Sequence, residues 1–397
     1  MNNSDLKIFT ENIEWDALNQ IYTLVAQAPF NGKKVRIMPD VHYGKGCVVG
    51  FTAELGDKII PNVIGVDIGC GMYTAELGKT EIDYRGLDDF IKAKIPYGSA
   101  CRKEYGKETL IKELRCFDKL TDLGRLYGSL GTLGGGNHFI EIDRDEQDNK
   151  YLVIHTGSRN LGLQVAKHYQ KLAVEVCKNC AEMEKKKATD ELNRLKRPDK
   201  IPDALAEISA KYSERTKIPA ELCYLDGGDM DDYIHDLRIC QRFAVLNRKR
   251  IAEDILGFLK INKYSAFETV HNFIGDDNIV RKGAIPAYKD QKILIPMNMR
   301  DGCLIAVGKG EPDWNFSAPH GAGRLFKRSE AKSMFTVDQY KEEMEGIYTT
   351  TANASTLDES PMAYKPMDEI IGLISPTAEI LKIIKPVYNF KAADGKE

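Results

Sequence analysis

Apolar and polar residues are arranged along this chain in two patterns, one typical of buried strands and one of helices. The segment Trp15–Ala28 has the apolar spacing of a helix. From Val35 to Leu77, short apolar runs are broken by glycines, which predicts buried strands joined by tight turns. Similar sequence returns over Gly131–Gly162 and Phe267–Arg324. The chain therefore has three patches of predicted sheet.

Helical patterns fill the intervals between these patches. Residues 82–128 are predicted to be mostly charged helix, and Asp231–Phe258 a further helix. Gln164–Lys217 has the pattern of long helices, and its mixed charges predict a helical hairpin that lies in solvent. Towards the end of the chain, the pattern predicts helices around Ser329–Met344 and Met367–Ile384.

The order of these segments predicts one domain rather than two. No linker rich in proline, glycine or serine separates two halves, and the sequence has no internal repeat. We therefore expect a mixed α/β (α+β) fold in which buried β-sheets are surrounded by helices. A single large domain should span residues 1–397, with the charged helical excursion at about 164–217. Segments far apart in the sequence should build one site.

Composition narrows the class of protein. Hydrophobic residues make up 43% of the chain and charged residues 29%, which is typical of a globular protein. No apolar run approaches the ~18 residues of a membrane span, and the first residues lack a secretion signal. Nine cysteines, an odd number, do not suggest a disulfide framework, so we expect a cytoplasmic protein. A net charge of −3 argues against a protein that coats nucleic acid.

Several histidines stand where functional side chains are expected. Loops at strand ends carry many such side chains, and these histidines follow apolar runs beside small or amide residues: His138, His155, His271 and His320. Asp67 and Cys70 add a carboxylate and a thiol after another apolar run. This mixture suits a divalent transition metal better than Mg²⁺ or Ca²⁺. For any one of the histidines, a hydrogen-bonded structural role is the alternative.

Other histidines and cysteines fit structural roles. Cys177 and Cys180 have the spacing of a metal-binding pair, but no second pair accompanies them and they lie within a helical pattern. We interpret them as two thiols on an ordinary helix. His168 and His235 also lie on predicted helices, and we expect them to be structural.

Glycine-rich turns beside the same histidines offer phosphate-binding sites. His320 stands in the turn PHGAGR, whose free backbone N–H groups could hold phosphate oxygens while Arg324 and Arg328 clamp them. His320 is therefore a candidate metal ligand, general base or nucleophile, with a structural capping turn as the alternative. Gly134–Gly136 and Gly157–Arg159 offer two further turns. These residues indicate a metalloenzyme that acts on a phosphorylated substrate, but they do not name the reaction.

Taken together, the motifs resemble the RtcB family of RNA-splicing ligases. They follow the family's order over nearly the whole chain, and the combination of GVDIGCGM, GNHFIE and HGAGR is highly specific. The motifs are MPDVHYGKG (38–46), GVDIGCGM (65–72), GTLGGGNHFIEI (131–142), HTGSRNLG (155–162), LNR (246–248), HN (271–272), RKGA (281–284), HGAGR (320–324) and MAYK (362–365).

The resemblance implies an RNA ligase that depends on GTP and Mn²⁺ and has the family's own mixed α/β fold. Such enzymes join RNA 3′-phosphate or 2′,3′-cyclic phosphate ends to 5′-hydroxyl ends through a histidine–GMP intermediate, in tRNA splicing or RNA repair. Residue matching makes His320 the nucleophile. Archease is a candidate protein partner. Two Mn²⁺ ions are implied, one held by Asp67, Cys70 and His138 and the other by Cys70, His155 and His271.

The same matching implies the residues that contact guanylate and RNA. Guanylate contacts are expected from Asn137, His138, Phe139, Ile140, Glu141, His271, Asn272, Pro296, Met297, Asn298, Met299, Cys303, His320, Gly321, Ala322, Gly323 and Lys391. We expect RNA phosphates to be contacted, without base readout, by Arg159, Arg324 and Arg328.

The chain departs from the family's pattern in its nucleotide loop. The usual Pro-Gly-Ser-Met-Gly is replaced by Pro-Met-Asn-Met-Arg at Pro296–Arg300, and Cys303 stands where a serine is expected. Six residues also follow Lys391, where the family usually ends. We therefore expect GTP to be preferred less strictly than usual.

Two other functions compete with the ligase. One is a dinuclear-metal phosphoesterase that acts on nucleic-acid ends without joining them. The other is a non-catalytic RNA-binding paralogue, which would have no need of the intact metal set or of His320.

Overall fold

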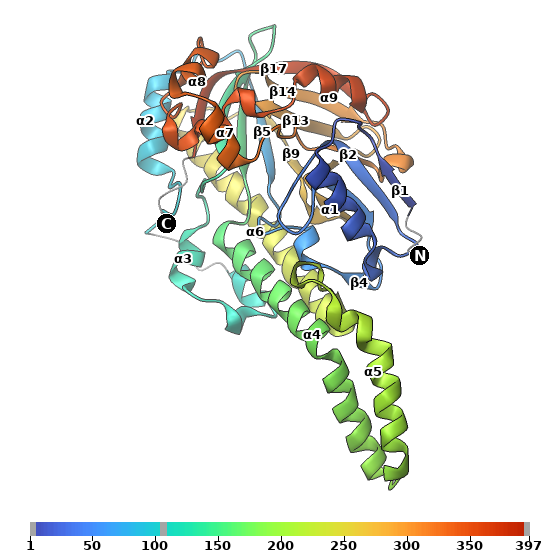
Figure 1. Cartoon of the computed structure of the whole chain (residues 1–397). Helices are drawn as coiled ribbons and strands as arrows, with labels where there is room; N and C mark the ends of the chain where they lie inside the picture. Colours follow the sequence, from blue (N-terminus) through green and yellow to red (C-terminus); the bar gives the residue numbers. More distant parts are fainter. Residues whose placement is uncertain (1–4, 104–108, 393–397) are drawn as a thin grey trace.

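Two β-sheets form the centre of the computed structural model, which describes residues 5–103 and 109–392 (Figure 1). Helices cover their outer faces, and one helical pair projects far from the body. The prediction of a mixed α/β fold is therefore confirmed. Residues 393–397, which make up most of the extension past Lys391, lie outside the described residues.

The larger sheet supplies the frame of the site. Its strands run in the order β13 (Lys292–Asn298), β14 (Gly302–Gly308), β17 (Ala378–Lys391), β6 (Phe139–Arg144), β7 (Lys150–Thr156), β5 (Gly71–Gly78) and β9 (Ser265–Val270). Neighbours on this path are antiparallel, and β16 (Tyr348–Thr349) pairs in parallel with β17. Alternation along β6 turns Ile140 and Ile142 into the core and Phe139 and Glu141 towards the opposite face.

The smaller sheet brings the N-terminal part of the chain to the same region. Its order is β1 (Asp5–Ile8), β2 (Lys34–His42), β3 (Val49–Glu54), β11 (Ile279–Lys282) and β10 (Asn272–Ile274), with β1 and β2 parallel and the rest antiparallel. Two short pairs link the parts: β12 (Ala284–Pro286) with β15 (Ser317–Pro319), and β4 (Lys58–Ile59) with β8 (Leu225–Asp226).

Helices bury their apolar faces against these sheets. Ile21 and Leu24 of α1 (Trp15–Val25) join the core of the smaller sheet, whereas α2 (Tyr84–Lys94) and the last turns of α6 (Gly227–Phe258) share a core with the larger one (Figure 1). The other helices of the body are α3 (Leu123–Gly128), α7 (Arg328–Met334), α8 (Val337–Glu343) and α9 (Met367–Ile374). Short 3₁₀ turns occupy Ala28–Phe30, Pro61–Val63, Thr109–Glu113, Phe117–Lys119, Pro198–Lys200, Ala220–Leu222, Pro312–Trp314, Ala354–Glu359 and Pro361–Ala363. In residues 5–103 and 109–392, no helix is long and apolar enough to cross a membrane.

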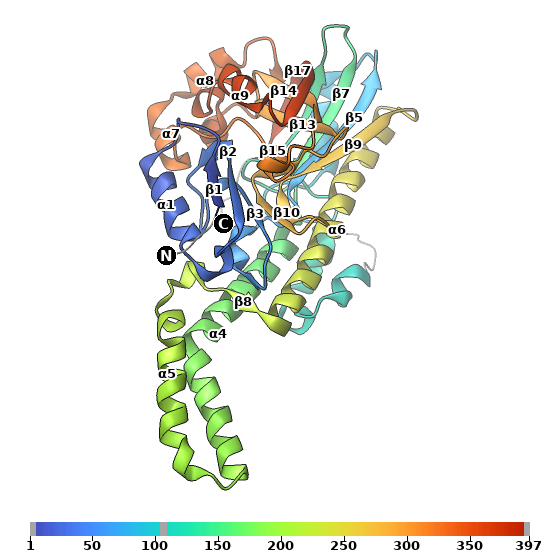
Figure 2. The same ribbon diagram turned by 90° about the vertical axis from the view of Figure 1, so that its right-hand side faces the viewer.

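The projecting pair is the helical hairpin expected from the charged segment. It consists of α4 (Arg159–Arg194) and α5 (Ile201–Lys217), and it extends away from the body in both views (Figures 1 and 2). The buried residues of α4 end at Cys180, and α5 has none in the described structure. Cys177 and Cys180 lie on α4, as expected of two thiols on a helix.

Two helix predictions were wrong in part. Over residues 82–128, the described α-helix is limited to α2 and α3; Pro96 and Gly98 follow α2, and 3₁₀ turns and loops occupy the rest, with 104–108 outside the described residues. The helix predicted over Met367–Ile384 ends at Ile374, and β17 begins at Ala378. The apolar spacing there is helical, but the isoleucines are β-branched and β17 fills the gap between β14 and β6.

Two other helices are shorter than predicted. The predicted helix Ser329–Met344 is divided into α7 and α8, because Thr336 accepts a hydrogen bond from the Gln339 backbone and starts a new helix. The first helix ends at Val25, and a 3₁₀ turn follows.

Candidate active site

Five metal-ligand candidates from distant parts of the chain converge at one end of the larger sheet. The Sγ atom of Cys70 lies 3.2 Å from Nε2 of His155 and 3.5 Å from Nε2 of His138. Nε2 of His155 is 3.4 Å from Nε2 of His271, and Nε2 of His138 is 2.8 Å from the Asp67 carboxylate. They meet because β6, β7, β5 and β9 are neighbours in the sheet.

Backbone carbonyls fix how two of the rings point. Nδ1 of His138 lies 2.9 Å from the Leu133 carbonyl, and Nδ1 of His155 lies 3.1 Å from the Asn137 carbonyl. A carbonyl can only accept, so the contact with Asn137 assigns the ring proton of His155 to Nδ1. The Nε2 lone pair of His155 then faces the cluster, as metal coordination requires.

Burial sets the charge of the cluster. It lowers the pKa of His138 and, more strongly, those of His155 and His271, so the last two rings are neutral. Burial also raises the pKa of the Cys70 thiol. Burial tends to raise the pKa of Asp67, but the hydrogen bond and charge of His138 outweigh burial and hold this pKa well below its usual range. Neutral imidazoles, a carboxylate and a thiol that a cation would deprotonate form a donor set that fits divalent transition metals.

A buried arginine and a glycine hold the loops of the cluster in place. Nη1 of Arg248 donates to the carbonyls of Gly69 (2.8 Å) and Thr156 (2.9 Å), which are the neighbours of Cys70 and His155 in the sequence. Its Nη2 pairs with Glu268 at 2.8 Å. At Gly157, a Cβ atom would stand 2.1 Å from an Asp67 oxygen, so only glycine permits this approach.

His320 stands beside the cluster and is oriented by a buried carboxylate. Its Nδ1 lies 2.6 Å from Oδ2 of Asp40, which also accepts the backbone N–H groups of His320 (3.0 Å) and Gly321 (3.3 Å). The His320 and His271 rings are 4.9 Å apart. A Cβ atom at Gly323, whose φ is +79°, would stand 2.4 Å from the Asp40 carbonyl. The glycine-rich turn thus places the His320 ring against the Asp40 carboxylate. Sequence analysis assigned no role to Asp40.

A cavity of about 780 Å³ opens beside these residues, which is large enough for a nucleotide. Most of the predicted guanylate contacts line it: Asn137, Phe139, Glu141, His271, Asn272, Pro296, Met297, Asn298, Met299, Cys303, His320, Gly321, Ala322, Gly323 and Lys391. His138 lies behind this lining, among the metal-ligand candidates. The side chain of Ile140 points away, into the core with Ile142.

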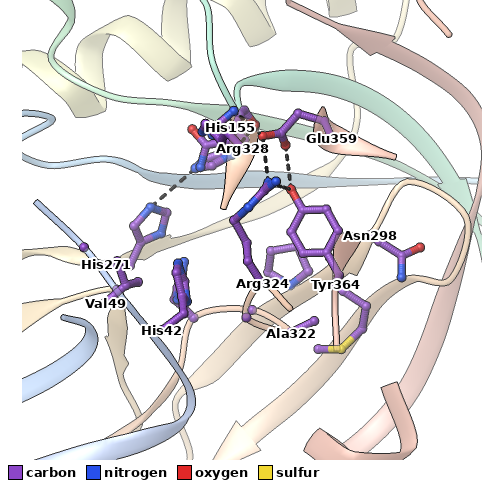
Figure 3. Close-up of a pocket in the computed structure, with 18 of the residues that line it drawn as sticks. His42, Val49, His155, His271, Asn298, Ala322, Arg324, Arg328, Glu359 and Tyr364 are labelled. Carbon is purple, nitrogen blue, oxygen red and sulfur yellow. Dashed lines mark hydrogen bonds and ion pairs between the residues drawn. The ribbon is translucent and has the colours of Figure 1, made fainter. Parts of the chain in front are cut away.

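Glu359 accepts hydrogen bonds from several side chains on the far wall of the cavity. Sequence analysis did not identify this residue either. Lys391 donates to Glu359 at 2.8 Å and to the Asn137 carbonyl at 3.1 Å. Tyr364 donates its hydroxyl to Glu359 at 2.6 Å (Figure 3). Burial opposes ionisation of Glu359, but Lys391 and the neighbouring arginines hold its pKa well below the usual range. Lys391 is the last residue of β17 and is buried, so it is not part of a frayed tail.

The three arginines predicted to contact RNA phosphates differ in their surroundings. Arg324 pairs with Glu359 at 3.2 Å (Figure 3). Arg328 pairs with Asp358 at 2.8 Å and with Glu359. Both line the cavity, and the Arg328 side chain is 42% exposed. Arg159 lies on the other side of His138, with Nη1 3.0 Å from its Nδ1, and does not line the cavity.

The divergent nucleotide loop forms the end of the β13–β14 hairpin. Asn298 donates to Asp301 at 2.8 Å and accepts the backbone N–H groups of Arg300 and Asp301. The Asn298 amide therefore closes the turn, although its residue lines the cavity. Cys303 is buried at the start of β14.

The chain is similar to known proteins over nearly its whole length. A family described as tRNA-splicing ligase RtcB matches residues 21–117 and 118–392. The chain therefore belongs to the RtcB family. It is 29% identical to the RNA-splicing ligase RtcB of Escherichia coli K12, with 98% of each chain covered. It is 28% identical to the tRNA-splicing ligase RtcB of Aeropyrum pernix, over 84% of this chain and 82% of that protein.

Replacing the central thiol should empty the cluster. In Cys70→Ala, we expect Mn²⁺ affinity to fall by at least about 10–100-fold, the loss that follows removal of even an indirect partner of a metal ligand. Bound metal is measured by mass spectrometry after equilibrium dialysis. Cys47→Ser, which removes an equally buried thiol beside Lys282, is the matched control and should keep its metal. Full occupancy in Cys70→Ala would refute the assignment.

Proposed function

We propose that this chain is an RNA ligase that uses GTP and Mn²⁺ to join RNA 3′-phosphate or 2′,3′-cyclic phosphate ends to 5′-hydroxyl ends. The observation that carries the proposal is the position of His320. Its Nδ1 lies 2.6 Å from the Asp40 carboxylate, and its ring lies next to the cluster of imidazoles and thiol. It also lines a cavity large enough for a nucleotide. The names of the relatives, RNA-splicing and tRNA-splicing ligases, support the substrate class.

His320 is the proposed nucleophile towards the α-phosphate of GTP. Because Asp40 accepts the Nδ1 proton, Nε2 keeps its lone pair for the bond to phosphorus. The nearby Asp40 carboxylate also stabilises the positive charge that develops on the ring as this bond forms. Pyrophosphate leaves, and the guanylate on His320 passes to the RNA 3′-phosphate. The 5′-hydroxyl then attacks the activated phosphate and releases GMP.

The metal cluster fits the two ions that this chemistry needs. Asp67, Cys70 and His138 would hold one Mn²⁺, and Cys70, His155 and His271 the other; Cys70 lies between His138 and His155, as a shared ligand must. When bound, the ions neutralise phosphate oxygens and polarise the phosphorus. The loops held by Arg248 keep the donor atoms together before any ion arrives.

The far wall of the cavity supports a guanine site. A guanine offers the O6 acceptor and the N1–H and N2 donors. Lys391 has three N–H groups, of which Glu359 and the Asn137 carbonyl engage two, so the third can donate to O6. Glu141 lines the same cavity and can accept from N1–H and N2. Arg328, the most exposed of the three arginines proposed for RNA, is best placed to meet an RNA phosphate at the cavity mouth.

The direct test supplies the chain with GTP, Mn²⁺ and two RNAs, one ending in a 3′-phosphate and the other beginning with a 5′-hydroxyl. A ligated product and a protein–GMP adduct are expected, and His320→Ala should lose the adduct while it keeps its metal. That variant should still seal RNA already carrying a 3′-guanylate, because the last step does not use the imidazole. Release of the terminal phosphate without joining or adduct would instead support a phosphoesterase.

Asp40 should affect the rate of adduct formation but not the metal content of the protein. Asp40→Asn removes the negative charge at the Nδ1 contact of His320, and we expect adduct formation in a single turnover to slow by about 10²–10⁴-fold. Metal content should stay unchanged, since the observed hydrogen bonds of the Asp40 side chain go to His320 and Gly321. An unchanged rate in a folded variant would remove Asp40 from the mechanism.

Lys391 should set the preference for guanine. In Lys391→Ala, guanylylation efficiency with GTP should fall by an amount equivalent to about 1–3 kcal/mol, the cost of a lost charged hydrogen bond, while the weaker reaction with ATP changes little. Both nucleotides are compared by single-turnover adduct formation. Lys382→Ala, on the same strand but paired with Asp145, is the control. Equal losses with both nucleotides would show that Lys391 does not read the base.

A further inference from the structure

An exposed tyrosine stands at the mouth of the cavity. Tyr43 belongs to the loop 43–48 between β2 and β3, and it lines the cavity although it is 47% exposed. It lies three residues after Asp40, which is about 10 Å along an extended chain, and it directly follows His42 in the same lining. The residues expected to contact guanylate do not include Tyr43, so the proposed reaction leaves this ring without a role.

Contacts on both sides hold the loop in one conformation. The side-chain amide of Gln20 on α1 donates to the Gly44 carbonyl at 2.7 Å and accepts the Gly44 N–H at 3.3 Å. The buried Lys282 ammonium donates to the Cys47 carbonyl at 2.8 Å. A Cβ atom at Gly44 would stand 2.4 Å from that carbonyl oxygen, so the tight turn requires glycine. The Tyr43 ring is therefore carried on a preorganised loop, which lowers the entropic cost of binding against it.

Positive side chains surround the ring. The Lys327 ammonium lies 5.4 Å from the centre of the Tyr43 ring, and Lys45 follows Tyr43 by two residues. Both lysines line the cavity, as does Arg328. Lys327 pairs with Asp16 at 2.8 Å, but these side chains are 46% and 56% exposed, so the ion pair is weak and can yield to a phosphate.

An aromatic ring beside cations is the arrangement by which proteins hold single-stranded nucleic acid. The ring stacks on a base, and the cations contact the phosphates of the backbone. Every base has a π-face, so stacking suits an enzyme that is expected to contact RNA without base readout. Glu14 lines the cavity as well, and burial raises the pKa of its carboxyl, which reduces its repulsion of a phosphate.

We propose that Tyr43 stacks on a base at the 3′-phosphate end of the RNA and that Lys45 and Lys327 contact the phosphates beside that base. The inference rests on the proposed function, in which this end must bring its phosphate to Nε2 of His320. Tyr43 is suited to that end because the strand just before it, β2, carries Asp40, the carboxylate against which His320 is held.

RNA binding tests the contact without any chemical step. The Mn²⁺-loaded chain, without GTP, is titrated into a fluorescein-labelled single-stranded RNA that ends in a 3′-phosphate, and fluorescence anisotropy gives the Kd. Tyr43→Ala should raise this Kd by about 5–150-fold, the loss that follows removal of one base–aromatic stack, whereas Tyr43→Phe should stay near the parent. Tyr22→Ala removes a tyrosine that is 55% exposed but does not line the cavity, and it should match the parent. Unchanged affinity in Tyr43→Ala, or an equal loss in Tyr43→Phe, would overturn the stacking contact.

A photochemical cross-link on the unaltered chain identifies the RNA end and does not depend on how a variant folds. Thiouridine is placed in one RNA at the nucleotide that bears the 3′-phosphate and in a second RNA at the 5′-hydroxyl nucleotide. After irradiation and digestion, mass spectrometry should locate the cross-link of the first RNA in residues 43–48 and that of the second elsewhere. A first RNA that cross-links only outside this loop would overturn the proposal.

Adduct formation separates this inference from the proposed ligase. The protein–GMP adduct forms before RNA is joined, so a parent chain that forms no adduct refutes the proposed function, whatever the RNA-binding result. In ligation by an active parent, Tyr43→Ala should raise the KM for the 3′-phosphate RNA while kcat changes much less, because stacking holds the RNA alike before and during the reaction. An unchanged KM would refute the RNA contact and leave the ligase standing.

Discussion

The candidate active site depends on one buried guanidinium, that of Arg248. Its hydrogen bonds to the carbonyls of Gly69 and Thr156 join the loops that carry Cys70 and His155, and its ion pair with Glu268 ties both to β9. Removing one partner of such a buried charge is strongly destabilising, so the arrangement is maintained as a unit. The ligand atoms are therefore held in place by protein contacts alone, and an ion would meet a preorganised site.

The candidate metal ligands could be predicted from the sequence, but the residues that orient them could not. His155 and His271 follow apolar runs and His138 directly precedes one, so their place at strand ends could be predicted. Asp40 contacts His320 across 280 positions of the chain, and no periodicity links residues so far apart. The same limit applies to the ion pairs of Glu359: Arg324 and Arg328 were expected to face RNA alone, and both pair with this carboxylate.

The fold class followed from the alternation of glycine-rich apolar runs with helical segments, but one boundary failed for a definite reason. Ile380, Ile383 and Ile384 have helical spacing, yet β17 forms there. The local spacing of apolar residues gives no information about the strand position between β14 and β6, because that position exists only in the tertiary structure. That strand delivers Lys391 to the cavity, so the element that was mispredicted is also one that builds the site.

The hairpin of α4 and α5 should tolerate changes in sequence that the body of the molecule does not. α4 begins at Arg159, four residues after His155, and its 36 residues extend about 54 Å. Because α5 buries no described side chain, turns could be added to or removed from the outer half without moving any ligand atom. Substitutions there should be nearly neutral for stability. The length and sequence of the hairpin can therefore change during evolution as those of an isolated helical pair can. The sequence of the body is constrained by its packed core.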